Sequence, residues 1–250
     1  MKNILFAASE CVPFIKTGGL ADVVGSLPKY FDKKKYDVRV VLPKYSCMNQ
    51  KWKDQLEYMD HFYMNLAGED RYVGILKYVQ DGITFYFIDN ESYFNGEKPY
   101  GDWYWDLEKF CFFCRAALSA LPVIGFQPDV VHCHDWQTGL IPVLLKDTFR
   151  GGDFFRNMKS VITIHNLKFQ GVWDVKTIKR FTELPDYYFA PDKLEPIRRQ
   201  SVKGRYCICG CHYHGKQYIR RGDQDAVLRR RPGWPDAGQG QQSSGNRKRN

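Results

Sequence analysis

Short apolar runs alternate with segments of helical periodicity along most of the chain. Residues 3–8, 37–42, 128–133 and 160–165 are apolar runs of strand length, and the apolar spacing of residues 20–30 is typical of an amphipathic helix. Helices between short apolar strands are the pattern of β–α–β units with parallel strands. The sequence therefore predicts an α/β protein with a Rossmann-like, doubly wound and mostly parallel sheet.

One part of the pattern departs from this alternation. Residues 58–66, 72–79 and 83–88 are three short runs rich in β-forming residues, and Asp81-Gly82 lies between the last two. Asp-Gly is a typical two-residue hairpin turn. We therefore expect a short antiparallel excursion from the parallel sheet, and we expect helices over residues 110–121 and 136–146.

A glycine pair stands where the first predicted strand leads into the first predicted helix. Lys16 precedes Gly18 and Gly19, and Asp22 follows one turn inside the helix. Free backbone N–H groups at a helix start and a backbone without Cβ atoms suit a phosphate or a sugar hydroxyl. The alternative interpretation is that the two glycines only make a tight turn.

Polar side chains follow two further predicted strands. His134 and Asp135 end one strand, and His165 and Asn166 end another. Because ligands of open α/β sheets bind at the carboxyl ends of the strands, these residues and the glycine turn predict one shared site. A single histidine at a strand end is more often structural. His132, next to this cluster, also allows a metal-ligand interpretation, but alternate strand residues point to opposite faces and only part of the set would converge.

An aromatic segment lies between the antiparallel runs and the helix predicted over 110–121. It contains Tyr93, Phe94, Tyr100, Trp103 and Tyr104. Exposed aromatic rings can stack on sugar faces, whereas a buried aromatic cluster beneath a loop is the structural alternative.

Charge is distributed unevenly along the chain. The formal net charge is +9, but residues 196–250 contain 13 Lys and Arg against 3 Asp and Glu, which leaves residues 1–195 with a net charge of −1. The main part of the chain therefore has no basic bias that would indicate a nucleic-acid partner.

The beginning of the sequence lacks the features of a secretory signal, and no apolar run is long enough for a transmembrane helix. Five cysteines are scattered through residues 1–195, mostly among apolar neighbours. We interpret them as reduced core thiols. These features predict a cytoplasmic protein with no membrane partner.

Three motifs together resemble one family. Residues 16–23 (KTGGLADV, after SECVPF at 9–14), 132–138 (HCHDWQT) and 163–167 (TIHNL, before FQG at 169–171) resemble the signatures of bacterial glycogen synthases and plant starch synthases. All three occur in the family's order and at about its spacing, within residues 1–195. The resemblance implies a glycosyltransferase-B architecture, of which residues 1–195 would be the N-terminal catalytic domain.

The resemblance also implies an activity and roles for residues. Such an enzyme transfers glucose from ADP-glucose to the non-reducing end of an α-1,4-glucan such as glycogen, with retention of the anomeric configuration and with no metal or other cofactor. Lys16 and the backbone at Gly18 and Gly19 would bind the donor, and His165 and Asp22 would act in catalysis. The remaining substrate-binding candidates are His134, Asp135, Trp136, Asn166, Tyr93 and Tyr100.

The composition changes after residue 195. Arg, Gln and Gly dominate, and Cys207, Cys209, Cys211, His212 and His214 lack the paired spacing of a structural zinc site. One choice of synonymous codons for residues 206–250, read one base later, gives a sequence containing VSNTYAEEI that resembles the family's continuation. We therefore predict that residues 196–250 are a frameshifted and largely disordered tail.

Alternative functions remain at this point. A nicotinamide oxidoreductase would need a Gly-x-Gly-x-x-Gly turn, which the chain lacks at residues 16–23. A non-catalytic glucan-binding fragment is a second alternative, and a nucleic-acid binder acting through the arginines of the tail is a third. Because the family's second domain is not recognisable in the sequence, we expect this chain to be inactive, or nearly so, by itself.

Overall fold

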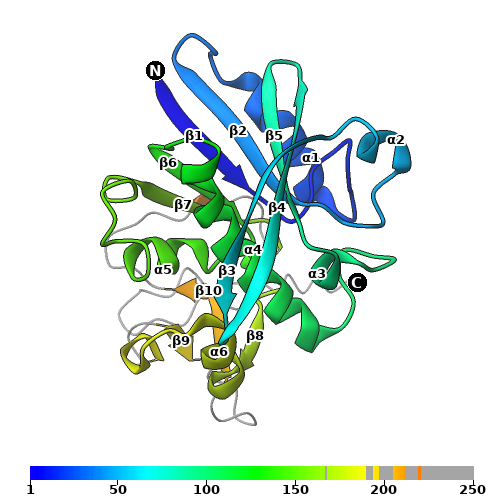
Figure 1. The fold of residues 1–250 in the computed structure, drawn as a ribbon. Coiled ribbons are helices and arrows are strands. Elements are labelled where there is room, and N and C mark those ends of the chain that lie inside the picture. Colours follow the sequence, from blue (N-terminus) through cyan, green and yellow to red (C-terminus); the bar gives the residue numbers. More distant parts are fainter. Residues whose placement is uncertain (167, 190–193, 197–204, 212–218, 221–250) are drawn as a thin grey trace, which may run out of the picture.

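The computed structural model describes residues 1–166, 168–189, 194–196, 205–211 and 219–220. Its main element is a sheet in which six strands are parallel and the last two at one edge are antiparallel (Figure 1). In spatial order the strands are β11 (Ile219–Arg220), β7 (Lys159–Ile164), β6 (Val130–His134), β1 (Lys2–Ala7), β2 (Tyr36–Pro43), β5 (Ile83–Asp89), β4 (Glu69–Gln80) and β3 (Glu57–Leu66). The predicted mostly parallel sheet and its antiparallel excursion are both confirmed.

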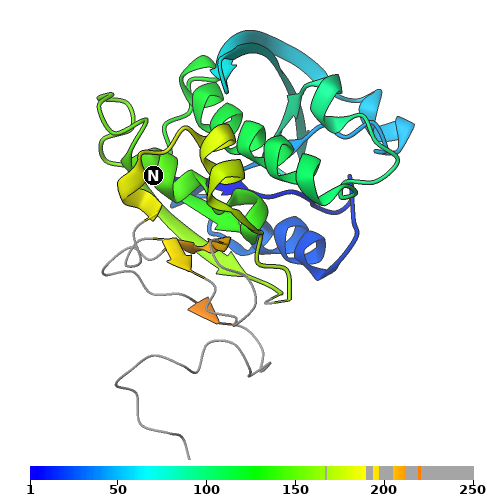
Figure 2. The same cartoon turned by 90° about the horizontal axis from the view of Figure 1, so that it is seen from below.

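The helices cover both faces of this sheet. Figure 2 shows α1 (Gly19–Ser26) on one face and α4 (Trp103–Val123) with α5 (Ile141–Lys146) on the other. This arrangement follows from right-handed crossovers, because the chain moves from β1 to β2 in one direction and from β5 to β6 in the opposite direction. The smaller helices are α2 (Gln50–Lys53), α3 (Glu91–Phe94) and α6 (Val175–Thr182), and 3₁₀ segments span Leu27–Tyr30, Trp136–Thr138 and Asp186–Phe189.

The central strands are apolar because helices cover them on both sides. Phe6, Val40 and Val131 have no accessible surface, and Leu5 is almost as deeply buried. Strands that are buried on both faces have continuous apolar runs rather than alternating ones. The strand length of these runs therefore identifies the parallel strands in the sequence.

Helix α4 begins earlier than the periodicity predicts. The expectation was a helix over residues 110–121, but the helix starts at Trp103 and takes in part of the aromatic segment. The carboxylate of Asp102 caps it by accepting hydrogen bonds from the backbone N–H groups of Tyr104 and Trp105 at 2.8 and 3.2 Å. Pro122 lies in the last turn of this helix.

A second, small sheet contains β8 (Val172–Asp174), β10 (Arg205–Cys211) and β9 (Leu194–Pro196), with antiparallel pairing on both sides of β10. β10 and β11 belong to the tail, so these short parts of it form strands. The remainder of the predicted disordered tail, with His212 and His214 of the Cys-His cluster at 207–214, lies outside the described residues.

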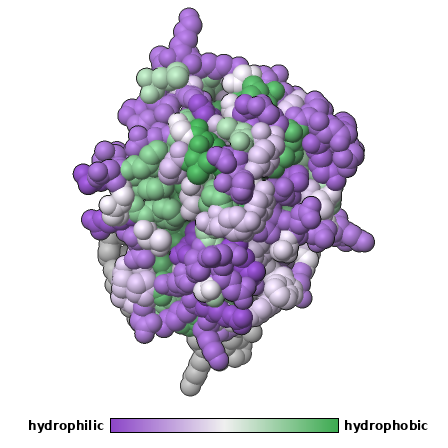
Figure 3. Space-filling model, in the orientation of Figure 1, coloured by the Kyte–Doolittle hydropathy of each residue, from purple (hydrophilic) through white to green (hydrophobic). Residues whose placement is uncertain are grey.

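The surface in the orientation of Figure 1 is mostly hydrophilic, with smaller groups of hydrophobic residues among the polar ones (Figure 3). In the part of the chain that the structure describes, none of the helices has the length and apolar character needed to span a bilayer. Among residues 1–189, the free cysteines are Cys11, Cys111, Cys114 and Cys133, which are buried, and Cys47, which is partly buried.

Candidate active site

The candidate site lies where the strand order reverses. β1 leads into α1 on one face of the sheet, and its neighbour β6 leads towards α5 on the other face. In doubly wound sheets, a crevice forms at such a switch point, outside the carboxyl ends of the two strands. The glycine turn follows β1, His134 and Asp135 end β6, and His165 follows β7. The predicted shared edge therefore corresponds to the arrangement in the structure.

The glycine turn is held from inside the protein by Glu10. This carboxylate is only 4% exposed and accepts hydrogen bonds from the backbone N–H of Thr17 and from that of Gly18, the latter at 3.2 Å. The Thr17 hydroxyl donates a further bond at 2.8 Å. Two backbone N–H groups of the predicted ligand-binding turn are thus bonded to an internal carboxylate.

Lys16 and Asp22 form an ion pair at the rim of the site. Lys16 Nζ lies 2.8 Å from Asp22 Oδ1, and both side chains are 54% exposed. The pair connects the turn to the first turn of α1, and its exposure leaves both charges in contact with solvent. A ligand phosphate can therefore reach Lys16 without displacing any buried group.

Two histidines from neighbouring strands contact each other directly. His134 Nδ1 lies 2.9 Å from His165 Nε2, and the two rings are stacked at 15°. His134 is fully buried, its other ring nitrogen has no hydrogen-bond partner, and burial holds its pKa well below the usual value. His165 is half-buried, so this pair extends from the core to the site.

His132 lies on the same side of β6 as His134, and the centroids of the two rings are 4.2 Å apart. Burial lowers the pKa of His132 to about 4, and its Nε2 lies 2.7 Å from the Thr163 hydroxyl. Within the described residues, no three His, Cys, Asp or Glu side chains lie close enough together to hold a metal ion. The structure gives the histidines hydrogen-bond and ring partners instead.

Asp135 combines burial with an unusual backbone. Its φ of 57° and ψ of −173° fall in a region that is almost restricted to glycine, and such strain is concentrated at functional sites. Its Oδ1 accepts a hydrogen bond from the backbone N–H of His165 at 2.6 Å. Burial, together with the nearby charge of Glu10, raises the pKa of Asp135 to about 6. The carboxylate thus fixes the start of the loop that follows β7.

Trp136 and Asn166 occupy different environments beside this cluster. Trp136 is 6% exposed and packs edge-on against Phe110 and beneath Gly171. Asn166 is exposed, and its side-chain oxygen accepts a hydrogen bond from the backbone N–H of Lys168 at 2.9 Å. Of the two, only Asn166 presents its surface to a ligand directly.

The two candidate tyrosines, Tyr93 and Tyr100, lie in different clusters of the structure. The Tyr100 hydroxyl lies 2.7 Å from the Ser9 hydroxyl and donates to Glu10 at 3.0 Å, which places Tyr100 in the site. Tyr93 stacks on Phe112 and donates to Glu108 at 2.9 Å, so it belongs to another cluster against α4. Sequence reasoning gave Glu10 no role. Its signals in the sequence are that it is the first charged residue after a buried strand and that it falls within the motif at residues 9–14.

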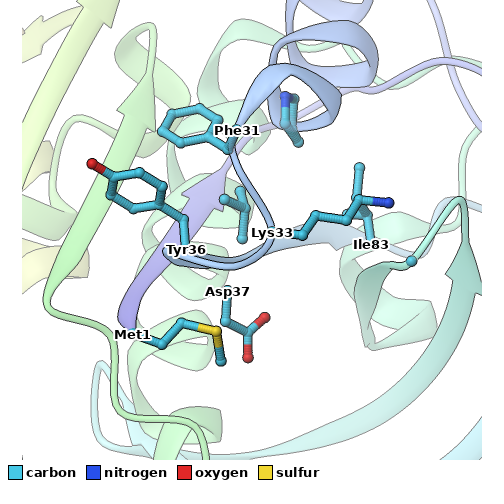
Figure 4. A pocket seen from close by; sticks show the side chains of 9 residues that line it. Met1, Phe31, Lys33, Tyr36, Asp37 and Ile83 are labelled. Carbon is cyan, nitrogen blue, oxygen red and sulfur yellow. The ribbon is translucent and has the colours of Figure 1, made fainter.

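A pocket of about 170 Å³ opens elsewhere, at the amino ends of β1 and β2. Phe31, Tyr36, Lys33 and Asp37 contribute to its wall (Figure 4). None of the candidate site residues lines it. It is therefore separate from the site at the carboxyl edge.

Fold and site together define a doubly wound α/β domain with a candidate ligand site at its switch point. A model of the starch synthase catalytic domain family matches residues 3–205. The chain is 62% identical over 195 residues to a glycogen synthase of Lachnospira eligens and 47% identical over 193 residues to one of Anoxybacillus flavithermus. These matches cover 78% and 77% of this chain. The chain belongs to the starch synthase catalytic domain family, and the resemblance inferred from the motifs is confirmed.

A solved structure agrees with this assignment. The catalytic domain of starch synthase IV from Arabidopsis thaliana, bound to ADP and acarbose, superimposes with a TM-score of 0.72 at 27% identity and covers 84% of this chain. The chain spans only about 41% of the length of the Lachnospira relative and 43% of the Arabidopsis chain. The predicted domain boundary at residues 195 and 196 stays a prediction.

Proposed function

We propose that this domain binds ADP-glucose and the non-reducing end of an α-1,4-glucan as part of a glucosyltransferase that retains the anomeric configuration. The observation that carries this proposal is the convergence of Lys16, Asp135 and the His134–His165 pair at the switch point. The ADP and acarbose in the Arabidopsis structure support a site for a nucleotide and a saccharide in this family. We place the reaction in the cytoplasm.

Glucosyl transfer requires protein groups that stabilise the charge developing in the transition state. As the glucosyl bond breaks, negative charge develops on the departing diphosphate and positive charge on the sugar ring. Lys16 stands at the exposed end of the turn, where a cation stabilises the leaving group. His165 lies at the end of the adjacent strand and would hydrogen-bond the transferred glucose. Asp22 orients Lys16 through their ion pair.

The other candidates have supporting roles in this proposal. Asp135 and Asn166 would shape the acceptor side, with His134 fixing the ring of His165. Tyr100 would stand between the turn and the glucan, while Trp136 acts through packing. The assignment of Tyr93 to the substrate stays a prediction, since its hydroxyl contacts Glu108.

The test uses the protein extended to the full length of its relatives. His165→Ala should slow transfer from ADP-glucose to glycogen by about a hundred- to thousandfold, the typical effect of losing one contact to a developing charge. His61→Ala is the control, because His61 is an exposed histidine on β3 at the far edge of the sheet. Near-normal transfer by His165→Ala would refute the proposed role.

The chain as it stands gives a second measurement. Since it spans 41% of the Lachnospira relative, we expect the remaining length to supply the opposite side of the site, so residues 1–250 should transfer almost no glucose. Co-sedimentation with glycogen but no transfer by the extended protein would favour a non-catalytic glucan-binding function. Robust glucosyl transfer by residues 1–195 would contradict the expectation that the site needs residues from the remaining length of the protein.

A further inference from the structure

Glu10 makes an unusually complete set of hydrogen bonds for a buried carboxylate. One oxygen accepts from the Thr17 hydroxyl at 2.8 Å and from the Tyr100 hydroxyl at 3.0 Å. The other accepts from the backbone N–H groups of Thr17 and Gly18. The whole residue is 4% exposed, so these donors replace the water that a carboxylate would otherwise bind.

The compensation comes from neutral donors. None of the ion pairs found among the described residues includes Glu10. Hydrogen bonds to an ionised acceptor are stronger than those between neutral groups. The geometry of the turn is therefore coupled to the presence of this carboxylate.

The donors come from both faces of the sheet. Thr17 and Gly18 precede α1 on one face, while Tyr100 precedes α4 on the other. Ser9 holds the Tyr100 hydroxyl at 2.7 Å, so the tyrosine is fixed from a second side. A single carboxylate thus ties the entrances of two helices to the end of β1.

We propose that Glu10 is a positioning residue that fixes the Lys16–Gly19 turn against Tyr100 in its ligand-binding shape. Because the N–H groups of Thr17 and Gly18 are bonded to Glu10, Lys16 and the backbone beyond Gly18 are left to meet the ligand. The proposal concerns the shape of the turn. It rests on the proposed function only for the identity of the ligand as a nucleotide sugar.

Glu108 provides a matched control. It is also a buried carboxylate, 9% exposed, and it accepts a hydrogen bond from a tyrosine hydroxyl, that of Tyr93 at 2.9 Å. Its charged neighbour is Arg71 at 3.8 Å, and it lies within α4 rather than next to the glycine turn. Glu108→Gln therefore reports the general effect of neutralising a buried carboxylate in this fold.

The first measurement is amide hydrogen exchange of the 250-residue chain, read at Thr17 and Gly18. Glu10→Gln should accelerate exchange at both amides by about ten- to a hundredfold, as expected when bonds to a charged acceptor are lost. Glu108→Gln should leave both rates at the wild-type value. Unchanged rates in Glu10→Gln, or equal acceleration in Glu108→Gln, would overturn the proposal.

If Glu10→Gln does not fold, a second variant, Thr17→Val, tests the positioning role of Glu10. Thr17→Val removes one exposed side-chain donor to Glu10 and should accelerate exchange at Gly18 while leaving the melting temperature almost unchanged. Exchange at Gly18 that stays at the wild-type rate in Thr17→Val would overturn the proposal.

Calorimetric titration of ADP-glucose separates this proposal from the proposed function. If the wild-type chain binds ADP-glucose, Glu10→Gln should weaken binding by about tenfold and Glu108→Gln should not. Equal binding by wild type and Glu10→Gln would overturn the positioning role. If the wild type does not bind ADP-glucose, the proposed function fails for this chain, and the exchange rates alone decide the role of Glu10.

Discussion

The side chains of His134 and His165 join the ends of two neighbouring parallel strands, with 2.9 Å between Nδ1 of the first and Nε2 of the second. A hydrogen bond between two imidazoles needs one N–H donor and one bare nitrogen. Burial keeps the pKa of His134 well below its usual value, so this ring is neutral at physiological pH. The half-buried ring of His165 is thus oriented by a neutral, fully buried neighbour.

Lys16→Ala should separate activity from stability. The Lys16–Asp22 pair is exposed on both sides, so its loss should change the free energy of unfolding by only about 0.2–1 kcal/mol. In the protein extended to the length of its relatives, glucosyl transfer should fall by about a hundred- to thousandfold. Steady-state rates and denaturant midpoints of the same preparation measure both effects.

Lys2→Ala is the control for that experiment. Lys2 also forms an exposed ion pair, with Asp129 at 2.7 Å, but at the amino ends of the strands. It should change stability by a similar small amount and leave transfer unaffected. A large loss of stability in Lys16→Ala, with transfer falling only in proportion, would assign Lys16 a structural role instead.

Two substitutions of Asp135 test the strain in its backbone. Asp135→Ala and Asp135→Gly both remove the carboxylate, but only glycine adopts φ 57° and ψ −173° without strain. After allowing for the greater entropy of an unfolded glycine, Asp135→Gly should be more stable than Asp135→Ala by about 1–2 kcal/mol. Urea unfolding of the two variants measures the difference, and equal midpoints would contradict it.

The acid side of the stability profile should depend on Asp135. Burial lowers the pKa of His132 to about 4, so the stability gained from this neutral histidine is present above about pH 6.5 and is lost as the pH falls towards 4. Asp135 acts in the opposite direction. Burial and the charge of Glu10 raise its pKa to about 6, so the folded protein binds a proton at Asp135 more readily than the unfolded chain does. Asp135→Asn removes that offset and should lose stability more steeply on acidification, by up to about 1.4 kcal/mol per pH unit.

Asp129 provides a control of opposite sign. The hydrogen bond from Lys2 lowers the pKa of Asp129, so this carboxylate contributes stability at neutral pH that is lost as the pH falls. Asp129→Asn should therefore make the acid loss shallower. Melting temperatures at about pH 6.5 and about pH 4.5 compare Asp135→Asn with wild type, and a further measurement at about pH 3 compares Asp129→Asn, because a carboxylate with a lowered pKa loses its contribution only below about pH 4. Parallel profiles for Asp135→Asn and wild type would show that Asp135 titrates in its ordinary range.

Gly171→Ala should destabilise the loop that covers Trp136. A Cβ atom there would lie 2.9 Å from Trp136 Cβ, and Gly171 has a φ of +64°. Overpacking and left-handed strain together should cost about 1–3 kcal/mol of unfolding free energy. Gly151→Ala is the control, because its Cβ would meet nothing within 4 Å and its stability should stay within about 0.5 kcal/mol of wild type. Equal midpoints for both variants would show that this loop is free to move.

The sequence predicted the sheet well because its central strands are buried on both faces and have continuous apolar runs. Helix boundaries were less predictable. The helix expected over 136–146 is divided into Trp136–Thr138 and Ile141–Lys146, with Pro142 near the start of the second part. The start of α4 depends on the Asp102 cap, which an aromatic-rich segment obscured.

Sequence position predicted which residues share the edge of the sheet, but not what each side chain contacts. Tyr93 and Tyr100 are close in sequence, yet one bonds to Glu108 and the other to Glu10. Glu10 and Tyr100 are separated by 90 residues, so no local pattern relates them. Tertiary packing determines these hydrogen-bond partners, and the spacing and periodicity of the sequence do not reveal them.

The central position of β1 also determines when the site can form during synthesis. β1 pairs with β2 on one side. Its other side pairs with β6, which is more than 120 residues later in the chain, so that Ile4 lies opposite Val130. A nascent chain that has not yet emerged from the ribosome as far as β6 therefore carries an open hydrophobic strand edge. Such distant pairings slow folding, so the switch point is completed only after β6 has been synthesised, and the edge that carries His165 appears only when β7 has joined the sheet.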